Sequence, residues 1–251
     1  MASRRNAAES LRSGASLPMR RFPAQLPKGM SASEINWDAW SRHIESKRRR
    51  LGKLESTIQP FSLRAHLAEA TYISFRLDGL DVTEAQVQDA LATGRDRRTV
   101  RSRQAQRIRN HVALLREIDA QLLSGHPIAA GSIVRWYASI SSGLCPADLA
   151  EAAMARLVDH VHRINFPELR LAGAVQEIAR MHAGLLADPL VPGFNGILCR
   201  LLLRYQLGRC ALPPVFFHPD TPQAALQSLF TLLPILMEEI DRSLDVLLSG
   251  V

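Results

Sequence analysis

The sequence is poor in several features that would point to a functional class. It has three cysteines in 251 residues, and their spacing suits neither a disulfide framework nor a metal site, which indicates reduced cysteines in an apolar interior. No apolar run approaches the roughly 20 residues that a membrane-spanning helix needs. The residues after the first arginines are too polar for a signal-peptide core. These absences predict a cytoplasmic protein without membrane contact.

Motifs for phosphate and metal binding are also missing. There is no Gly-rich loop of the Walker or dinucleotide type, and there is no HExxH motif. His160 and His162 lie two residues apart, so on a helix they point to different faces and make poor joint ligands. We therefore expect no metal site. Three other histidines are scattered and are predicted to be surface residues or satisfied core residues: His111, His126 and His182.

Positive charge is in excess. The chain has 31 Lys and Arg against 24 Asp and Glu, a net charge of +7. Much of the excess lies before residue 30, at 47–53 and at 95–109, with the second cluster formed by Lys47, Arg48, Arg49, Arg50 and Lys53. Such clusters can neutralise nucleic-acid phosphates or meet an acidic protein, although no interleaved aromatic residues are present to stack bases. Solvated charge is the simplest interpretation, and both kinds of partner stay open.

Periodicity divides the chain into a basic flexible arm, residues 1–30, and one all-α domain, residues 31–251. The domain comprises N-terminal helices (31–94), a core (97–217) and a C-terminal helix (222–248). Ser31 and Glu34 form a capping signal for the first helix, Asp78-Gly79 closes the second, and Pro234 is expected to kink or divide the last. Adjacent Glu238 and Glu239 are predicted to form a solvated face. The predicted helices are 31–56, 62–78, 83–92, 97–124, 130–142, 146–163, 167–187, 195–208 and 222–248.

One interruption of this helical pattern has chemical interest. Two prolines and two glycines lie between residues 189 and 196, and Asn195-Gly196 immediately opens a new helix. Backbone amides at a helix start favour anions, and Arg200 follows one turn later. The segment predicts either a phosphate-binding loop or an ordinary connection between helices.

Residues 60–217 resemble the Fic family, with approximate motifs in the family's order and spacing. The family loop reads H-x-F-x-(D/E)-G-N-G-R-x-x-R between two helices, and a proline turn like Leu212-Pro-Pro-Val-Phe follows. Asn110-His-Val-Ala-Leu resembles an earlier family helix. Ser74-Phe-Arg-Leu-Asp78-Gly79 is similar to the family's inhibitory (S/T)-x-x-x-E-(G/N) segment, with Asp for Glu. The resemblance implies an all-α Fic-like bundle with an anion-type site where the loop enters a helix.

The resemblance also shows where this chain departs from the family. The family's loop His is the general base, and its place falls here to Asp188 or Pro189. A carboxylate is usually a much weaker base than imidazole at neutral pH. The family's acidic residue holds Mg²⁺ on ATP, and its place falls to Pro192 or Gly193, which offer no side-chain ligand. Ile197 replaces the first loop arginine.

The surviving residues suggest binding without catalysis. Gly193, Asn195, Gly196 and Arg200 are the candidate anion-binding residues, and Asp188 is a weak catalytic candidate. The family's inhibitory Glu pairs with the second loop arginine. The resemblance therefore implies that Ser74, Asp78 and Gly79 form an inhibitory-type contact with Arg200, with about 4 Å or less between the charged atoms of Asp78 and Arg200.

These expectations favour a pseudoenzyme that acts as a binding or regulatory protein with a protein partner and no cofactor. Two alternatives remain. One is an active protein adenylyltransferase with an atypical loop, which would use ATP, Mg²⁺ and Asp188. The other is a DNA-associated regulator that uses the basic arm and the helix at 97–109. The oligomeric state is left open.

Overall fold

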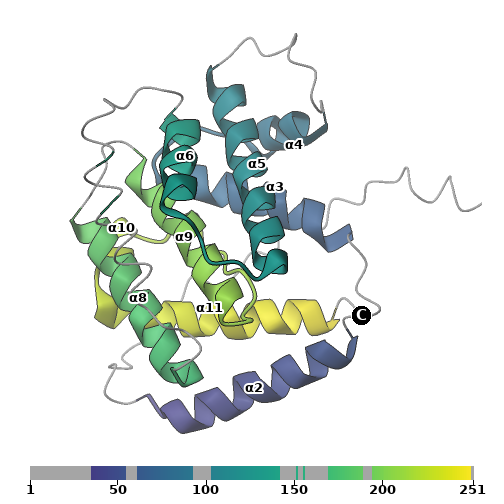
Figure 1. The fold of residues 1–251 in the computed structure, drawn as a ribbon, viewed down its shortest axis with the longest axis vertical. Helices are drawn as coiled ribbons and strands as arrows, with labels where there is room; N and C mark the ends of the chain where they lie inside the picture. The colour runs from purple at the N-terminus through teal and green to yellow at the C-terminus, as the bar shows by residue number, and fades with distance from the viewer. Residues whose placement is uncertain are drawn as a thin grey trace, which may run out of the picture.

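The structure is a computed structural model that describes residues 35–54, 61–92, 103–141, 169–188 and 194–249, with residues 151 and 155 between them. Every regular element in these ranges is an α-helix, which confirms the all-α prediction (Figure 1). None of these helices is long and apolar enough to cross a membrane. The predicted arm at 1–30 lies outside the described residues, as does most of the predicted helix at 146–163. The helices are α2 (Trp37–Leu54), α3 (Phe61–Leu77), α4 (Glu84–Ala92), α5 (Arg103–Ser124), α6 (Ala130–Ser141), α8 (Leu171–Ala187), α9 (Asn195–Arg209), α10 (Gln223–Gln227) and α11 (Leu229–Ser249).

Local capping and glycine turns explain several helix ends. The predicted start of the first helix at Ser31 is wrong, because residues 35 and 36 are not helical and α2 begins at Trp37. The side-chain oxygen of Asn36 accepts a hydrogen bond from the Ala39 N–H at 3.0 Å and caps this helix. The chain turns at Gly79 and Gly125 after α3 and α5, with φ angles of 72° and 71° that suit glycine.

The C-terminal segment divides at a different place from the one predicted. The break between α10 and α11 falls at Ser228, whose backbone is extended, and Pro234 lies inside α11. Thr231 stabilises the break, because its hydroxyl donates to the Ala225 carbonyl at 2.6 Å. Pro234 is tolerated because it stands in the second turn, where its missing N–H removes a single bond, the one to the Phe230 carbonyl.

Helix α9 lies at the centre of the fold. It packs against α8, α5 and α3, while α11 lies between α8 and α2 (Figure 1). Nine of its residues are buried, including Ile197, Leu202 and Leu207 at 0% exposure. A helix that is apolar on most sides is typical of a protein interior. This arrangement places the start of α9 against the end of α3.

Candidate functional site

The side chain of Asp78 meets the first turn of α9. Asp78 follows the last residue of α3, and its Oδ2 accepts a hydrogen bond from the backbone N–H of Ile197 at 3.1 Å. Its Oδ1 forms an ion pair with Nη2 of Arg200. The two charged side chains are only 13% and 11% exposed. The predicted contact between Asp78 and Arg200 is therefore confirmed as geometry, while its inhibitory role stays a prediction.

Ser74 holds the other side of the Arg200 guanidinium. Arg200 Nε donates to Ser74 Oγ at 2.9 Å, and Nη2 donates to the Ser74 carbonyl at 2.6 Å. Ser74 is buried and lies one helical turn before Asp78. The last turn of α3 thus supplies a carboxylate, a hydroxyl and a carbonyl to one arginine. The arginine is held in a single orientation between the two helices.

Gly196 and Asn195 allow α9 to start at this position. A Cβ atom on Gly196 would lie 2.2 Å from Oδ1 of Asp78, so only glycine leaves room for the carboxylate. The Asn195 side chain points elsewhere, because its Nδ2 donates to the Leu185 carbonyl at 2.6 Å. Asn195 therefore ties the start of α9 to the last turns of α8.

Among the residues that the structure describes, the remaining predicted positions add no side chain to the contact with Asp78. Asp188 follows α8, its N–H donates to the Gly184 carbonyl at 2.9 Å, and its side chain is exposed. Ile197, which stands where the resemblance places the first loop arginine, is 0% exposed and packs in the core. Gly193 lies outside the described residues. Gly79 continues the turn that begins at Asp78 and makes none of the side-chain contacts to Arg200.

The start of α9 is electrostatically suited to an anion, and Asp78 already supplies one. Partial positive charge collects on the free amides at a helix start, and the charge of Arg200 adds to it. A cavity of about 40 Å³ lies beside Ser74, His111 and Arg200. That volume holds one or two water molecules and is far below the roughly 300 Å³ of a small-molecule pocket.

Two buried histidines lie near Arg200 and are neutral at physiological pH. Burial, together with the positive charges of Arg200 and Arg204, lowers the pKa of His111 to about 3. Burial followed by the charge of Arg200 likewise lowers the pKa of His182 to about 3. His111 Nδ1 lies 3.0 Å from the Thr71 hydroxyl, as expected of a satisfied core histidine. The prediction holds only in part for His182, which is buried and has a backbone hydrogen bond with Cys199, but whose Nε2 has no hydrogen-bond partner among the described residues.

Sequence reasoning missed a second, partly buried ion pair. Asp119 of α5 accepts two hydrogen bonds from Arg204 of α9, from Nε to Oδ1 and from Nη2 to Oδ2, both at 2.9 Å. Arg204 follows Arg200 by four residues, so the two arginines share one face of the helix. The four-residue spacing of the two arginines could have marked Arg204 as a candidate site residue. It could not have identified Asp119 as the partner, which lies 85 residues away in the sequence.

The prediction for Glu239 is wrong. The pair Glu238 and Glu239 was expected on a solvated face, but Glu239 is only 6% exposed. Burial raises the pKa of Glu239 to about 7, although the charge of Arg242 opposes the rise. Arg242 contacts both carboxylates, at 2.7 Å for Glu238 and 2.6 Å for Glu239. This side of α11 therefore faces the interior.

Comparison with solved structures identifies the fold. A fragment of Fic-1 from C. elegans is 16% identical, with a TM-score of 0.65 over 85% of this chain and 72% of that one. A variant of the same fragment gives a TM-score of 0.67 at the same identity and coverage. A Fic domain-containing signalling protein from Bacteroides thetaiotaomicron is 18% identical, with a TM-score of 0.63 over 84% of this chain and 96% of that one. No family model and no curated protein sequence matches the chain.

These similarities establish an all-α Fic fold for this chain, as the sequence motifs indicated. At 16–18% identity, these similarities show the fold and nothing about activity. Activity and ligands therefore have to be argued from the side chains present here.

Proposed function

We propose that this Fic-fold protein is a pseudoenzyme that works as a binding or regulatory protein. The observation that carries the proposal is the position of Asp78. Its carboxylate takes the Ile197 N–H and the Arg200 guanidinium, the two groups that would otherwise receive a phosphate. The protein therefore carries its own anion in the place of a nucleotide.

The chemistry of nucleotidyl transfer supports an inactive site. Transfer of AMP needs a base near the target hydroxyl and a metal or fixed positive charges on the phosphates. The resemblance leaves the base position to the exposed Asp188 or to Pro189, which has no basic group, and it places the buried Ile197 at the first arginine position. His111 and His182 are buried, and their lowered pKa values leave them neutral, so they add no positive charge. Of the charged loop residues that the resemblance implies, only the second arginine is present, as Arg200, and it is already paired with Asp78.

The contact would then serve as a lock between helices. Arg200 binds the last turn of α3 through Ser74 and Asp78, so α3 and α9 are joined by charge as well as by packing. A lock of this kind would preserve the shape of the domain for recognition by a protein partner after catalysis is lost. No cofactor is needed for this role.

Incubation with labelled ATP and Mg²⁺ or Mn²⁺ tests the proposal. We compare the wild type with Asp78→Ala, which frees Arg200, and with Asp81→Ala as the matched control. Asp81 belongs to the same loop, but its side chain is fully exposed at 101% and makes only a 3.7 Å contact with Arg76. We expect no label on the protein or on any added protein with all three forms.

Transfer of label by Asp78→Ala would overturn the proposal. Label that appears in Asp78→Ala, stays absent in Asp81→Ala and is lost again when Asp188→Ala is added would establish an active adenylyltransferase with an atypical loop. Calorimetric titration with Mg²⁺–ATP separates binding from turnover. Heat of binding in Asp78→Ala without label incorporation would support a closed anion site in a pseudoenzyme.

A further inference from the structure

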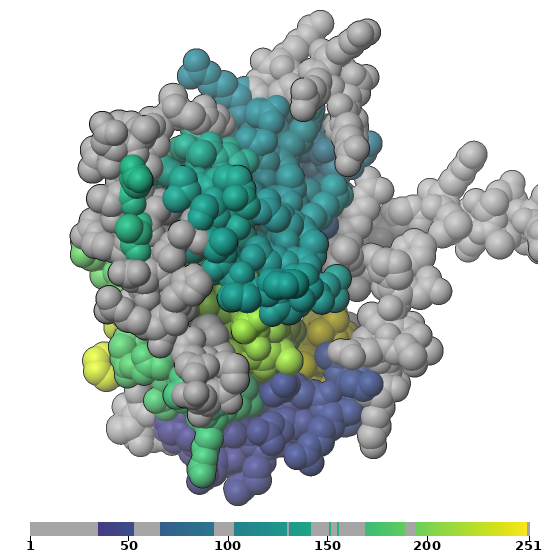
Figure 2. Space-filling view, viewed as in Figure 1, coloured from purple at the N-terminus to yellow at the C-terminus, as the bar shows by residue number. Residues whose placement is uncertain are grey.

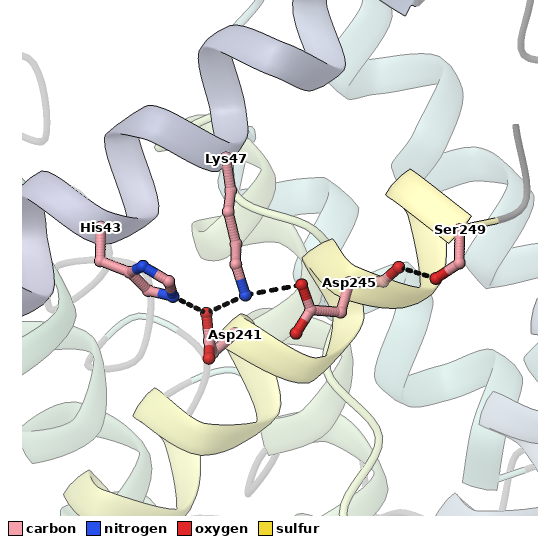
Figure 3. A network of polar contacts seen from close by, with 5 residues as sticks. All are labelled: His43, Lys47, Asp241, Asp245 and Ser249. Carbon is pink, nitrogen blue, oxygen red and sulfur yellow. Dashed lines mark hydrogen bonds and ion pairs between the residues drawn. The ribbon is translucent and has the colours of Figure 1, made fainter.

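Helix α2 has an inner face that is fixed by charge. Lys47 is 8% exposed, and its Nζ lies 2.7 Å from Asp241 and 2.6 Å from Asp245 of α11 (Figure 3). Burial alone would lower the pKa of Lys47, but the hydrogen bonds and charges of the two aspartates raise it. His43 Nε2 also lies 2.9 Å from Asp241. Together with the fully buried Ile44, these contacts determine which side of α2 faces the solvent.

The described side chains of the basic cluster at 47–53 are therefore divided between two faces of α2. Lys47 points inward and is unavailable to a partner, whereas Arg49 and Arg50 are exposed. Arg42 and Ser46 are exposed as well, and spacings of four, seven and eight residues from Arg42 place all four on one side of the helix. We call four residues of this surface the α2 stripe: Arg42, Ser46, Arg49 and Arg50. The exposed Glu45 lies among them. Figure 2 shows α2 along the lower edge of the molecule.

The positive charge of the α2 stripe is poorly compensated. Arg49 lies 3.8 Å from Glu45, but both side chains are well exposed, at 79% and 49%, and such pairs are weak. Arg42 and Arg50 form no ion pair with any residue that the structure describes. In the sequence, the 36 residues that precede α2 carry six basic and two acidic residues.

We propose that the α2 stripe binds the phosphate backbone of duplex nucleic acid without reading its sequence. Arginine suits phosphate because its planar guanidinium donates two parallel hydrogen bonds. Duplex DNA carries a charge about every 1.7 Å along its axis. Arg42 and Arg49, about 10 Å apart along the helix, therefore each meet a phosphate.

The stripe offers no apolar anchor to a protein partner and no aromatic side chain to a single strand. Tight protein interfaces depend on buried aromatic or aliphatic anchors, and the four residues of the stripe include none. Trp37 and Trp40 of the same helix are partly buried against the core instead. The stripe also lacks the aromatic side chains that stack on single-stranded bases and the Asn or Gln that pair with adenine, so its contacts with nucleic acid fall to its three arginines.

Fluorescence anisotropy with a labelled 20-base-pair duplex of arbitrary sequence tests this proposal. The variant Arg42→Ser/Arg49→Ser/Arg50→Ser removes the stripe. The charge-matched control Arg116→Ser/Arg135→Ser/Arg180→Ser removes three exposed arginines from α5, α6 and α8. We expect the stripe variant to bind at least about tenfold more weakly than the control, and the slope of log K against log salt to fall by about two to three.

Three results would overturn the proposal. These results are wild-type protein that shows no salt-dependent binding to the duplex, equal binding by the two triple variants, or labelled poly-glutamate that binds as tightly as the duplex. Thermal melts of both variants check folding, and we expect little change because the substituted side chains are exposed. The outcome is independent of ATP binding and AMP transfer, so it does not depend on the proposed pseudoenzyme function.

Discussion

Asp78 and Arg200 lie 122 residues apart in the chain and form a nearly buried ion pair between the end of α3 and the second turn of α9. Because the same carboxylate accepts the Ile197 N–H, one side chain satisfies a charge and a free helix amide together. Several measurable consequences follow from this contact and from the other buried polar groups.

Asp78→Asn is expected to lower the free energy of unfolding by about 1–3 kcal/mol. The substitution keeps the size of the side chain but leaves the charge of Arg200 without its carboxylate, while the bonds to Ser74 remain. Urea unfolding measures the change. Asp81→Asn, which alters an exposed residue of the same loop, should change stability by less than about 0.5 kcal/mol. Equal effects of the two variants would contradict the prediction.

Gly196→Ala should also disturb this contact. The new methyl group would overlap Oδ1 of Asp78 at 2.2 Å, so the carboxylate must leave Ile197 or Arg200. We expect a loss of about 1–3 kcal/mol in urea unfolding. Gly184→Ala in α8 is the control, since no atom lies within 4 Å of its added Cβ. The control should be neutral or stabilise the protein by up to about 1 kcal/mol, because alanine is the better helix former.

The pair of Asp119 and Arg204 is expected to matter as much as the pair of Asp78 and Arg200. Asp119→Asn removes the charge from a two-bond contact whose side chains are 21% and 10% exposed. Breaking one partner of such a pair should cost about 2–4 kcal/mol, measured by chemical unfolding. Glu177→Gln, which weakens an exposed contact with Arg180, provides the comparison. A smaller loss for Asp119→Asn than for Glu177→Gln would show that the buried pair adds no stability.

Glu239 predicts a dependence of stability on pH. Its folded pKa of about 7 lies above the ordinary value of 4.5, so the folded state holds a proton that the unfolded state releases. Stability from this group is present below pH 4.5 and is lost as the pH rises to 7. Glu239→Gln keeps a neutral side chain at every pH. The stability of the variant relative to wild type should therefore increase between pH 5 and pH 8, by on the order of 2 kcal/mol.

Unfolding curves at pH 5 and pH 8 measure this difference. Glu238→Gln is the control, because Glu238 contacts the same Arg242 but is more exposed, at 46% of its side chain. A relative stability of Glu239→Gln that stays constant with pH, or that follows Glu238→Gln, would show that burial of Glu239 does not govern the effect.

The amino-acid sequence by itself determined the helical class and most helix boundaries of this protein. Apolar spacing, the reciprocal hydrogen bonds of Thr83 and Gln86 at the start of α4, and the glycines after α3 and α5 act within a few residues, so they can be recognised locally. The motif order also indicated the Fic fold and the contact between Asp78 and Arg200. That contact was predictable because a family resemblance relates the two distant segments.

Only the tertiary structure decided which polar side chains are buried. Lys47 and Glu239 have charged neighbours in sequence that remain exposed, and packing against other helices turns these two inward. Asp119 pairs with Arg204 because α5 lies beside α9, which no local spacing reveals. The predicted C-terminal helix is divided at Ser228, and Pro234 lies inside α11. Helical periodicity reflects interactions over three or four residues, whereas burial and ion pairing depend on segments that meet only in the folded protein.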